Sequence, residues 1–271
     1  MEPKENKEKN DFIKTLSTKD HADLVFAGCD NCTMCCDGST YTSANVLLNE
    51  MFDTAKLFPV VFSKNGDKLS LSLLYTLAKG VPCPYLDMST KRCAVYDSIR
   101  PRACKIYPFN VRGMASSGNT LSYSVVFDSR CPGLREQKDS GVPLIGKDGR
   151  LSEKITQNFV GASMLRDYRE NLLQTEEFLN LIKECDLLTE QQYNIVEHSA
   201  SGYYGQNTIR VWKISEERLS ALDPEAVMKF HKKHFFNAIY THLNSLGNFD
   251  RLIRLKREYD SRRADLLTFR I

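Results

Sequence analysis

The feature that most constrains this chain is a run of four closely spaced cysteines, Cys29-x2-Cys32-x2-Cys35-Cys36. Soft thiolates two residues apart can point at one centre, as they do around zinc ions and iron–sulfur clusters. Neighbouring side chains diverge, so we assign Cys35 or Cys36 to a second metal or to a bridging or redox role. The predicted ligands are eight of the chain's nine cysteines: Cys29, Cys32, Cys35, Cys36, Cys83, Cys93, Cys104 and Cys131.

Simple burial and disulfide bonding are the two alternatives to metal binding for these cysteines. Free cysteine is often simply buried, but eight such residues between positions 29 and 131 are too clustered for packing alone. A disulfide framework is typical of secreted chains. The first 20 residues are polar and rich in Lys and Glu, without the apolar core of a signal peptide. We therefore expect a cytoplasmic protein with reduced thiols.

Composition is that of an ordinary globular chain. The 271 residues are 42% hydrophobic and 26% charged, with a net charge of +3. No apolar run is long enough for a membrane helix, and the charge gives no clear nucleic-acid signal. We expect an α+β fold with a disordered polar tail at 1–20, a loop-rich cysteine domain at 21–145 and a mainly helical domain at 146–271.

Local patterns predict the main elements. An amphipathic helix is expected over 43–58, with Thr42 or Ser43 as its N-cap, and a hairpin at Asn65-Gly66. Prolines at 82, 84, 101 and 108 indicate irregular turns around the later cysteines. A strand is expected over 121–127, a helix over 151–188, a strand over 208–214 and a helix capped by Asp223.

The cysteine segments together resemble a known family. CDNCTMCC, CPYLD, KRCAVYDSIRPRAC and KIYPF, within residues 26–133, resemble the CxxCxxCC cysteine-cluster family (YkgJ-type), a zinc- or iron-chelating domain. Flagellin lysine N-methylase is a larger, distant relative of that family and uses an iron–sulfur cluster. The resemblance implies bound metal at the eight cysteines and favours a protein-modifying enzyme of the lysine N-methylase kind.

The metal and the activity have alternatives. The first three cysteines match the start of a ferredoxin ligand run, which favours an iron–sulfur cluster of the 4Fe-4S kind over zinc or iron. Signatures of nucleotide-binding enzymes are missing, as is the radical-SAM spacing, so the sequence leaves open whether the protein is an enzyme. The alternative function is a non-catalytic chelating or structural metalloprotein with a helical interaction module.

The C-terminal region adds three expectations. His231, His234 and His242 are expected to be surface or interface histidines. A basic run is expected to form a solvated amphipathic helix, with docking of an acidic protein partner as the alternative: Arg251, Arg254, Lys256, Arg257, Arg262 and Arg263. The stretch AIYTHLNSLGNFDRLIRLK resembles the C-terminal part of the SapC family over one short segment, to which we attach no function.

Overall fold

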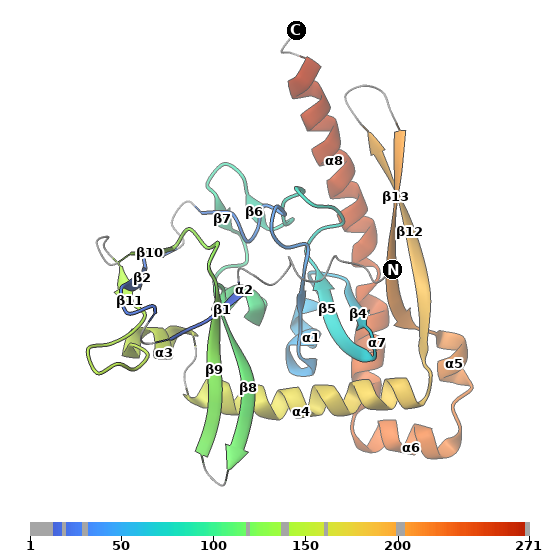
Figure 1. The fold of residues 1–271 in the computed structure, drawn as a ribbon. Coiled ribbons are helices and arrows are strands. Elements are labelled where there is room, and N and C mark those ends of the chain that lie inside the picture. Colours follow the sequence, from blue (N-terminus) through green and yellow to red (C-terminus); the bar gives the residue numbers. More distant parts are fainter. Residues whose placement is uncertain are drawn as a thin grey trace, which may run out of the picture. The chain divides into compact units, whose positions relative to one another are not determined.

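The protein has a mixed α+β fold, which confirms the expected class (Figure 1). The computed structural model describes residues 13–17, 20–28, 32–117, 120–136, 141–159, 162–198 and 204–268. These residues divide into two compact units, each made of separate chain segments. The first contains residues 1–34, 88–92 and 102–170, and the second contains 35–87, 93–101 and 171–271. The domain division expected at residues 145 and 146 stays a prediction.

The first unit contains two small antiparallel sheets. One has the order β1 (Ile13–Thr15), β9 (Thr120–Asp128), β8 (Phe109–Ser117). The other has the order β10 (Leu134–Glu136), β2 (Leu24–Phe26), β11 (Val142–Pro143). The helices are α2 (Arg102–Ile106), α3 (Glu153–Phe159) and the beginning of α4 (Ala162–Glu184). The core is aromatic and aliphatic: Phe109, Val111, Val125, Phe127, Leu144, Ile145 and Ile155. The expected strand at 121–127 lies within β9.

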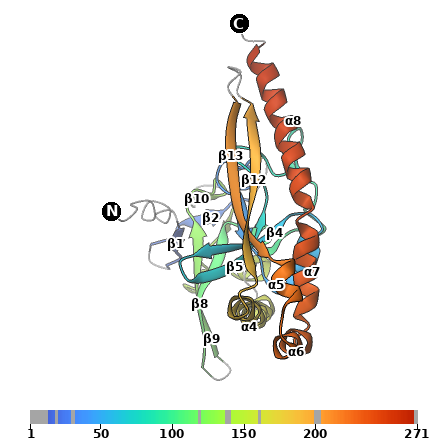
Figure 2. The same cartoon turned by 90° about the vertical axis from the view of Figure 1, so that its right-hand side faces the viewer.

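The second unit is organised around a five-stranded sheet. Its order is β12 (Leu188–His198), β13 (Tyr204–Ile214), β4 (Val60–Asn65), β5 (Lys68–Leu74), β3 (Ser43–Asn45). Strands β4 and β5 form the hairpin predicted from Asn65-Gly66, and Gly66 has the positive φ of +59° that such a turn favours. Strand β13 joins β4 where Trp212 lies opposite Phe62. Strands β12 and β13 form a long ribbon beside α8 (Asn248–Thr268) (Figure 2).

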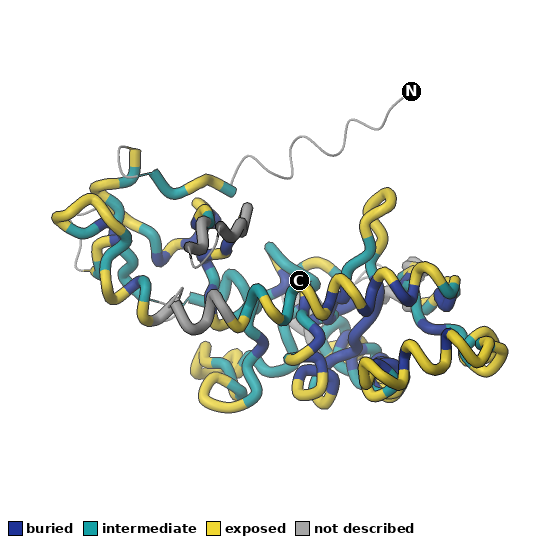
Figure 3. Tube along the Cα trace, turned by 90° about the horizontal axis from the view of Figure 1, so that it is seen from below, coloured by how far each residue is buried: buried dark blue, intermediate teal, exposed yellow. Residues whose placement is uncertain are grey.

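Helices complete the second unit. They are α1 (Leu48–Thr54), the remainder of α4, α5 (Glu216–Ser220), α6 (Pro224–Lys232) and α7 (Phe235–Ser245). The alternation of buried and exposed residues along these helices is drawn in Figure 3. Phe178 of α4 is fully buried, with ring centroids 6.3 Å from Phe62 and 5.2 Å from Phe235. A two-stranded ribbon, β6 (Leu86–Asp87) with β7 (Arg92–Cys93), is the other described sheet pairing.

His242 joins three elements inside the second unit. Its Nε2 accepts a hydrogen bond from the Ile214 amide at 3.1 Å, so Nδ1–H donates to the Val60 carbonyl at 2.8 Å. The side chain is fully buried, and burial lowers its pKa to about 4. The prediction of a surface or interface residue is therefore wrong for His242, whereas His231 and His234 are exposed. Nothing in the sequence around His242 indicates that its ring bonds to the backbone of Ile214 and Val60.

Helix boundaries differ from the predictions in two places. Residues 43–45 form β3, and α1 begins only at Leu48, whose amide donates to Thr175 Oγ1 at 2.9 Å. The cap is thus supplied by a residue distant in sequence, not by Thr42 or Ser43. Helix α4 ends at Glu184 and β12 begins at Leu188, so the C-terminal region contains a long β-ribbon as well as helices. Asp223 caps α6 as predicted, accepting from the Ala226 amide at 2.8 Å.

Candidate functional site

The thiols of Cys35 and Cys36 form the candidate reactive site of the second unit. Their Sγ atoms lie 3.5 Å apart in a mutual hydrogen bond, in which either sulfur can be the donor. Both residues are half-buried. A disulfide bond is about 2.05 Å long. A movement of the two sulfur atoms by about 1.5 Å therefore allows the thiols to be oxidised to a disulfide. The divergence of neighbouring side chains predicted from the sequence does not hold for this pair.

Backbone contacts hold the cysteine turn against the loop that follows β5. The Cys83 amide donates to the Cys36 carbonyl at 2.7 Å, and the Gly80 amide donates to the Gly38 carbonyl at 2.9 Å. Gly38 has a φ of +75°, and a Cβ atom there would lie 2.0 Å from the Val81 carbonyl oxygen. Glycine is therefore required for the two loops to approach each other, and this approach places the Cys83 backbone beside Cys36.

Arg100 provides positive charge near the thiol pair. The hydrogen bond to Cys36 raises the pKa of Cys35, burial and the charge of Cys36 raise it further, and the Arg100 guanidinium opposes them. Cys35 therefore keeps its proton at neutral pH. The Arg100 guanidinium stacks on the Tyr96 ring at 4.2 Å. Within the described residues, its buried Nε has no hydrogen-bond partner.

The other predicted ligands are divided between the units. Cys83 and Cys93 are half-buried residues of the second unit, while Cys32, Cys104 and buried Cys131 belong to the first. Cys29 lies outside the described residues. Tyr85 follows the Cys83 turn; it donates to the Leu57 carbonyl at 3.3 Å and accepts from Arg251 of α8. This aromatic residue beside the cysteines therefore makes structural contacts.

The basic run of α8 is not uniformly solvated. Lys256 is buried and pairs with Asp260 at 2.7 Å, while the Arg251 guanidinium lies over the Tyr85 ring at 4.7 Å. Arg254 and Arg257 are exposed, and the side chains of Arg262 and Arg263 lie outside the described part. Docking of an acidic protein partner on this helix stays a prediction.

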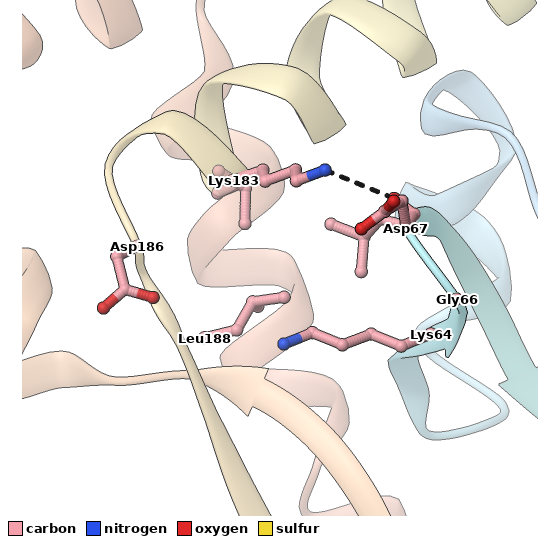
Figure 4. Close-up of a pocket in the computed structure, with 8 residues that line it drawn as sticks. Lys64, Gly66, Asp67, Lys183, Asp186 and Leu188 are labelled. Carbon is pink, nitrogen blue, oxygen red and sulfur yellow. Dashed lines mark hydrogen bonds between the residues drawn. The ribbon is translucent and has the colours of Figure 1, made fainter.

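Sequence reasoning missed a pocket with a charged rim. Figure 4 shows Lys64 and Asp67 on the β4–β5 hairpin, Lys183 of α4 reaching towards Asp67, and Asp186 beyond the end of α4 on the opposite side of the pocket. The cavity has a volume of about 160 Å³. Its only sequence signal was the Asn65-Gly66 turn, because nothing local indicates that the turn and the end of α4 meet.

Comparison with known proteins indicates a different family from the one that the cysteine pattern resembles. The family model described as SapC matches residues 16–252, which include described segments of both units. No solved structure matches the chain. Among the described residues, no helix is both long and apolar enough to cross a membrane. The expected cytoplasmic location stays a prediction.

Three expectations are corrected by these findings. The YkgJ-type resemblance, with its link to flagellin lysine N-methylase, is wrong, because the matching model is SapC. The metal-binding function is wrong on the same ground, both as a protein-modifying enzyme and as a non-catalytic metalloprotein. The description of the chain as an iron–sulfur protein is wrong with it. In the described part of the chain, moreover, no three His, Cys, Asp or Glu residues form a group that could hold a metal. The nature of any cofactor (iron–sulfur cluster, zinc or iron) and the role of the eight cysteines as its ligands stay predictions.

Proposed function

The chain belongs to the SapC family, and we propose that this member works as a thiol-based redox protein through Cys35 and Cys36. The family name carries no chemistry, so the proposal is based on the residues of this chain. The observation that carries it is the 3.5 Å separation of the two sulfur atoms. Among ordinary side chains, a pair of thiols in contact has one characteristic reaction, which is reversible oxidation to a disulfide.

The sequence position of the pair favours a reversible reaction over a structural bridge. Adjacent Cα atoms are about 3.8 Å apart, whereas disulfide-linked residues usually have Cα atoms about 4.4–6.8 Å apart. A Cys35–Cys36 disulfide is therefore strained and easily reduced. Strained disulfides have higher reduction potentials and serve as labile, regulatory or catalytic bonds. The pair thus suits cycling between two states.

We take a hydroperoxide as the oxidant class. The Cys36 sulfur attacks one peroxide oxygen, the O–O bond breaks, and an alcohol leaves with Cys36 as the sulfenic acid. The Cys35 sulfur then attacks the Cys36 sulfur, and the S–O bond breaks. The proton that Cys35 has kept leaves with the hydroxyl group as water. Two thiols are oxidised to one disulfide, and one hydroperoxide is reduced to an alcohol and water.

Arg100 supports the first step electrostatically. When the O–O bond breaks, negative charge develops on the leaving oxygen, and a fixed positive group stabilises it. The Arg100 guanidinium is near enough to lower the pKa of Cys35, and its buried Nε–H has no hydrogen-bond partner among the described residues. The Tyr96 ring supports the guanidinium plane. Arg100 is thus assigned a stabilising role in peroxide reduction.

The proposal is tested by oxidising the reduced protein with tert-butyl hydroperoxide and mapping the products by peptide mass spectrometry. The expected product is an intrapeptide disulfide between Cys35 and Cys36 that dithiothreitol reverses. Cys35→Ser should stop at a Cys36 sulfenic acid that dimedone traps, because no adjacent thiol resolves it. Arg100→Met should slow the reaction by about tenfold or more.

Cys185→Ser is the matched control, since Cys185 is also half-buried but lies alone at the end of α4. It should leave the oxidation unchanged. Two results would contradict the proposed pair. In the first, Cys36 forms its disulfide with a cysteine other than Cys35. In the second, the Cys36 thiol stays reduced while other cysteines are oxidised.

A further inference from the structure

The pocket between the β4–β5 hairpin and the end of α4 has an apolar floor. Ile182 and Leu188 are buried and Leu69 is half-buried, so the floor is built of branched aliphatic side chains. The volume of about 160 Å³ is well below the roughly 300–1,000 Å³ of pockets for drug-sized ligands. A ligand that fits must be small and must have an aliphatic part that displaces water from the floor.

The rim carries two positive and two negative groups. The Lys64 ammonium lies 3.4 Å from the centroid of the Trp212 ring, and a lysine ammonium has three donors, so donors remain for a ligand. Lys183 Nζ donates to the Asp67 backbone carbonyl at 3.4 Å. The formal charges of Lys64, Lys183, Asp67 and Asp186 sum to zero. Such a rim favours a ligand with both charges over a ligand with one.

The two carboxylates have free capacity. In the described structure the Asp67 carboxylate forms no hydrogen bond or ion pair, and Figure 4 shows it on the hairpin side of the pocket. Asp186 Oδ2 accepts from Arg218 at 2.8 Å, which leaves its other oxygen open, since a carboxylate accepts several hydrogen bonds. A ligand ammonium can therefore pair with either carboxylate without breaking an existing contact.

The backbone at Asp186 is held in an unfavourable conformation. Its φ is +48°, at the position after a helix where glycine is the usual residue. Arg218 fixes this turn by donating to the carbonyls of Asp186 and Leu188 at 2.8 and 3.0 Å. Strain held in place by neighbouring groups is frequent at ligand sites. The aspartate thus keeps a charge at the rim where glycine fits the backbone better.

We propose that this pocket binds a free amino acid with a branched aliphatic side chain. The ligand carboxylate lies between Lys64 and Lys183, its ammonium pairs with Asp67 or Asp186, and its side chain packs on the aliphatic floor. This site is separate from the thiol pair and does not depend on the proposed redox function. Its ligand is neutral overall, as the rim requires.

The first test is isothermal titration calorimetry with three matched probes. L-leucine carries both charges, 4-methylpentanoate lacks the ammonium, and 3-methylbutylamine lacks the carboxylate. L-leucine should bind with unit stoichiometry, and each of the other two should bind about tenfold or more weaker, because each loses one charge-assisted contact. Equal affinity for all three, or no heat with L-leucine at millimolar concentration, would overturn the proposal.

The second test uses Trp212, the only tryptophan of the chain, as a reporter. Because Lys64 lies over its ring, ligand binding should change the indole fluorescence in a saturable way. Lys183→Ala and the double variant Asp67→Asn/Asp186→Asn should each shift the midpoint at least about tenfold, because the ligand then loses a charged partner for its carboxylate or for its ammonium. Lys68→Ala is the control, since Lys68 is an exposed lysine of β5 that does not line the pocket, and its midpoint should not move. An equal shift in the control would refute a specific site.

Discussion

The second unit contains two regions with opposite construction, the cysteine loops and the sheet core around His242. None of residues 82–87 and 93–100 is buried, and the loops are held by backbone hydrogen bonds such as that from Cys83 to Cys36. In the core, Phe178, Phe62 and His242 are all at most 1% exposed. The difference teaches that free energy of folding is concentrated in the core, while the reactive groups lie in a region that contributes little to it.

The largest effect should come from removing the central ring of the core. Phe178→Ala is expected to lower the free energy of unfolding by about 3–5 kcal/mol, because it leaves a cavity between Phe62 and Phe235. Urea denaturation measures the change. Leu173→Ala on the same helix is the control: its side chain is 51% exposed, so its effect should stay below about 0.5 kcal/mol. Similar losses in both variants would remove the distinction between core and surface.

Acidification should destabilise the core next. His242 has a pKa of about 4 in the folded protein and about 6.5 when unfolded, so its contribution is complete above pH 6.5. This contribution of His242 to the free energy of unfolding is lost as the pH falls from 6.5 towards 4. The reason is that the unfolded chain then binds a proton that the folded chain excludes. The loss amounts to about 3 kcal/mol.

Urea titrations at pH 7.5 and 4.5 measure this dependence. His242→Gln should be less stable at pH 7.5 but should show a flatter pH profile. His231→Gln should keep the profile of the parent protein, since His231 is exposed. An unchanged profile in His242→Gln would mean that another group carries the pH dependence.

The smallest effect concerns the loops. Gly38→Ala should cost about 2–3 kcal/mol, because the positive φ is joined by a clash with the Val81 carbonyl. Gly66→Ala should cost only about 1 kcal/mol, since its φ of +59° is unfavourable but the space around it is open. Thermal unfolding compares the two. If Gly38→Ala also slows hydroperoxide oxidation of Cys36, the contact between the two loops positions the thiols as well as stabilising the loops.

Local signals were sufficient for local structure. The Asn65-Gly66 turn and the Asp223 cap were predicted from neighbouring residues, because the groups that fix them are close in sequence. The Thr175 cap of Leu48 and the histidine link were missed, because each joins residues more than a hundred positions apart. The cysteines had a different limit. Their spacing indicated a shared centre, but spacing does not tell which of them belong to one compact unit.

The site was predicted only in part for the same reason. Cys35 and Cys36 were named, with a redox role as one option, and Arg100 was present in the quoted motif. Their pairing depends on the turn at Gly38 and on contact with the loop after β5, which no local pattern encodes. Lys64 and Asp186 of the charged pocket were not named at all, since they meet only when α4 ends beside the hairpin.

The histidine link has a consequence for synthesis on the ribosome. His242 and Val60 are 182 positions apart, and in the described structure β13 pairs with β4 where Trp212 lies opposite Phe62. A nascent chain that ends before α7 therefore holds all five strands of the sheet but lacks His242, which bonds Ile214 and Val60, and lacks Phe235, which packs on Phe178. Cys35 and Cys36 leave the exit tunnel long before that closure. The thiols are thus exposed to the cellular redox environment before the fold that pairs them is complete.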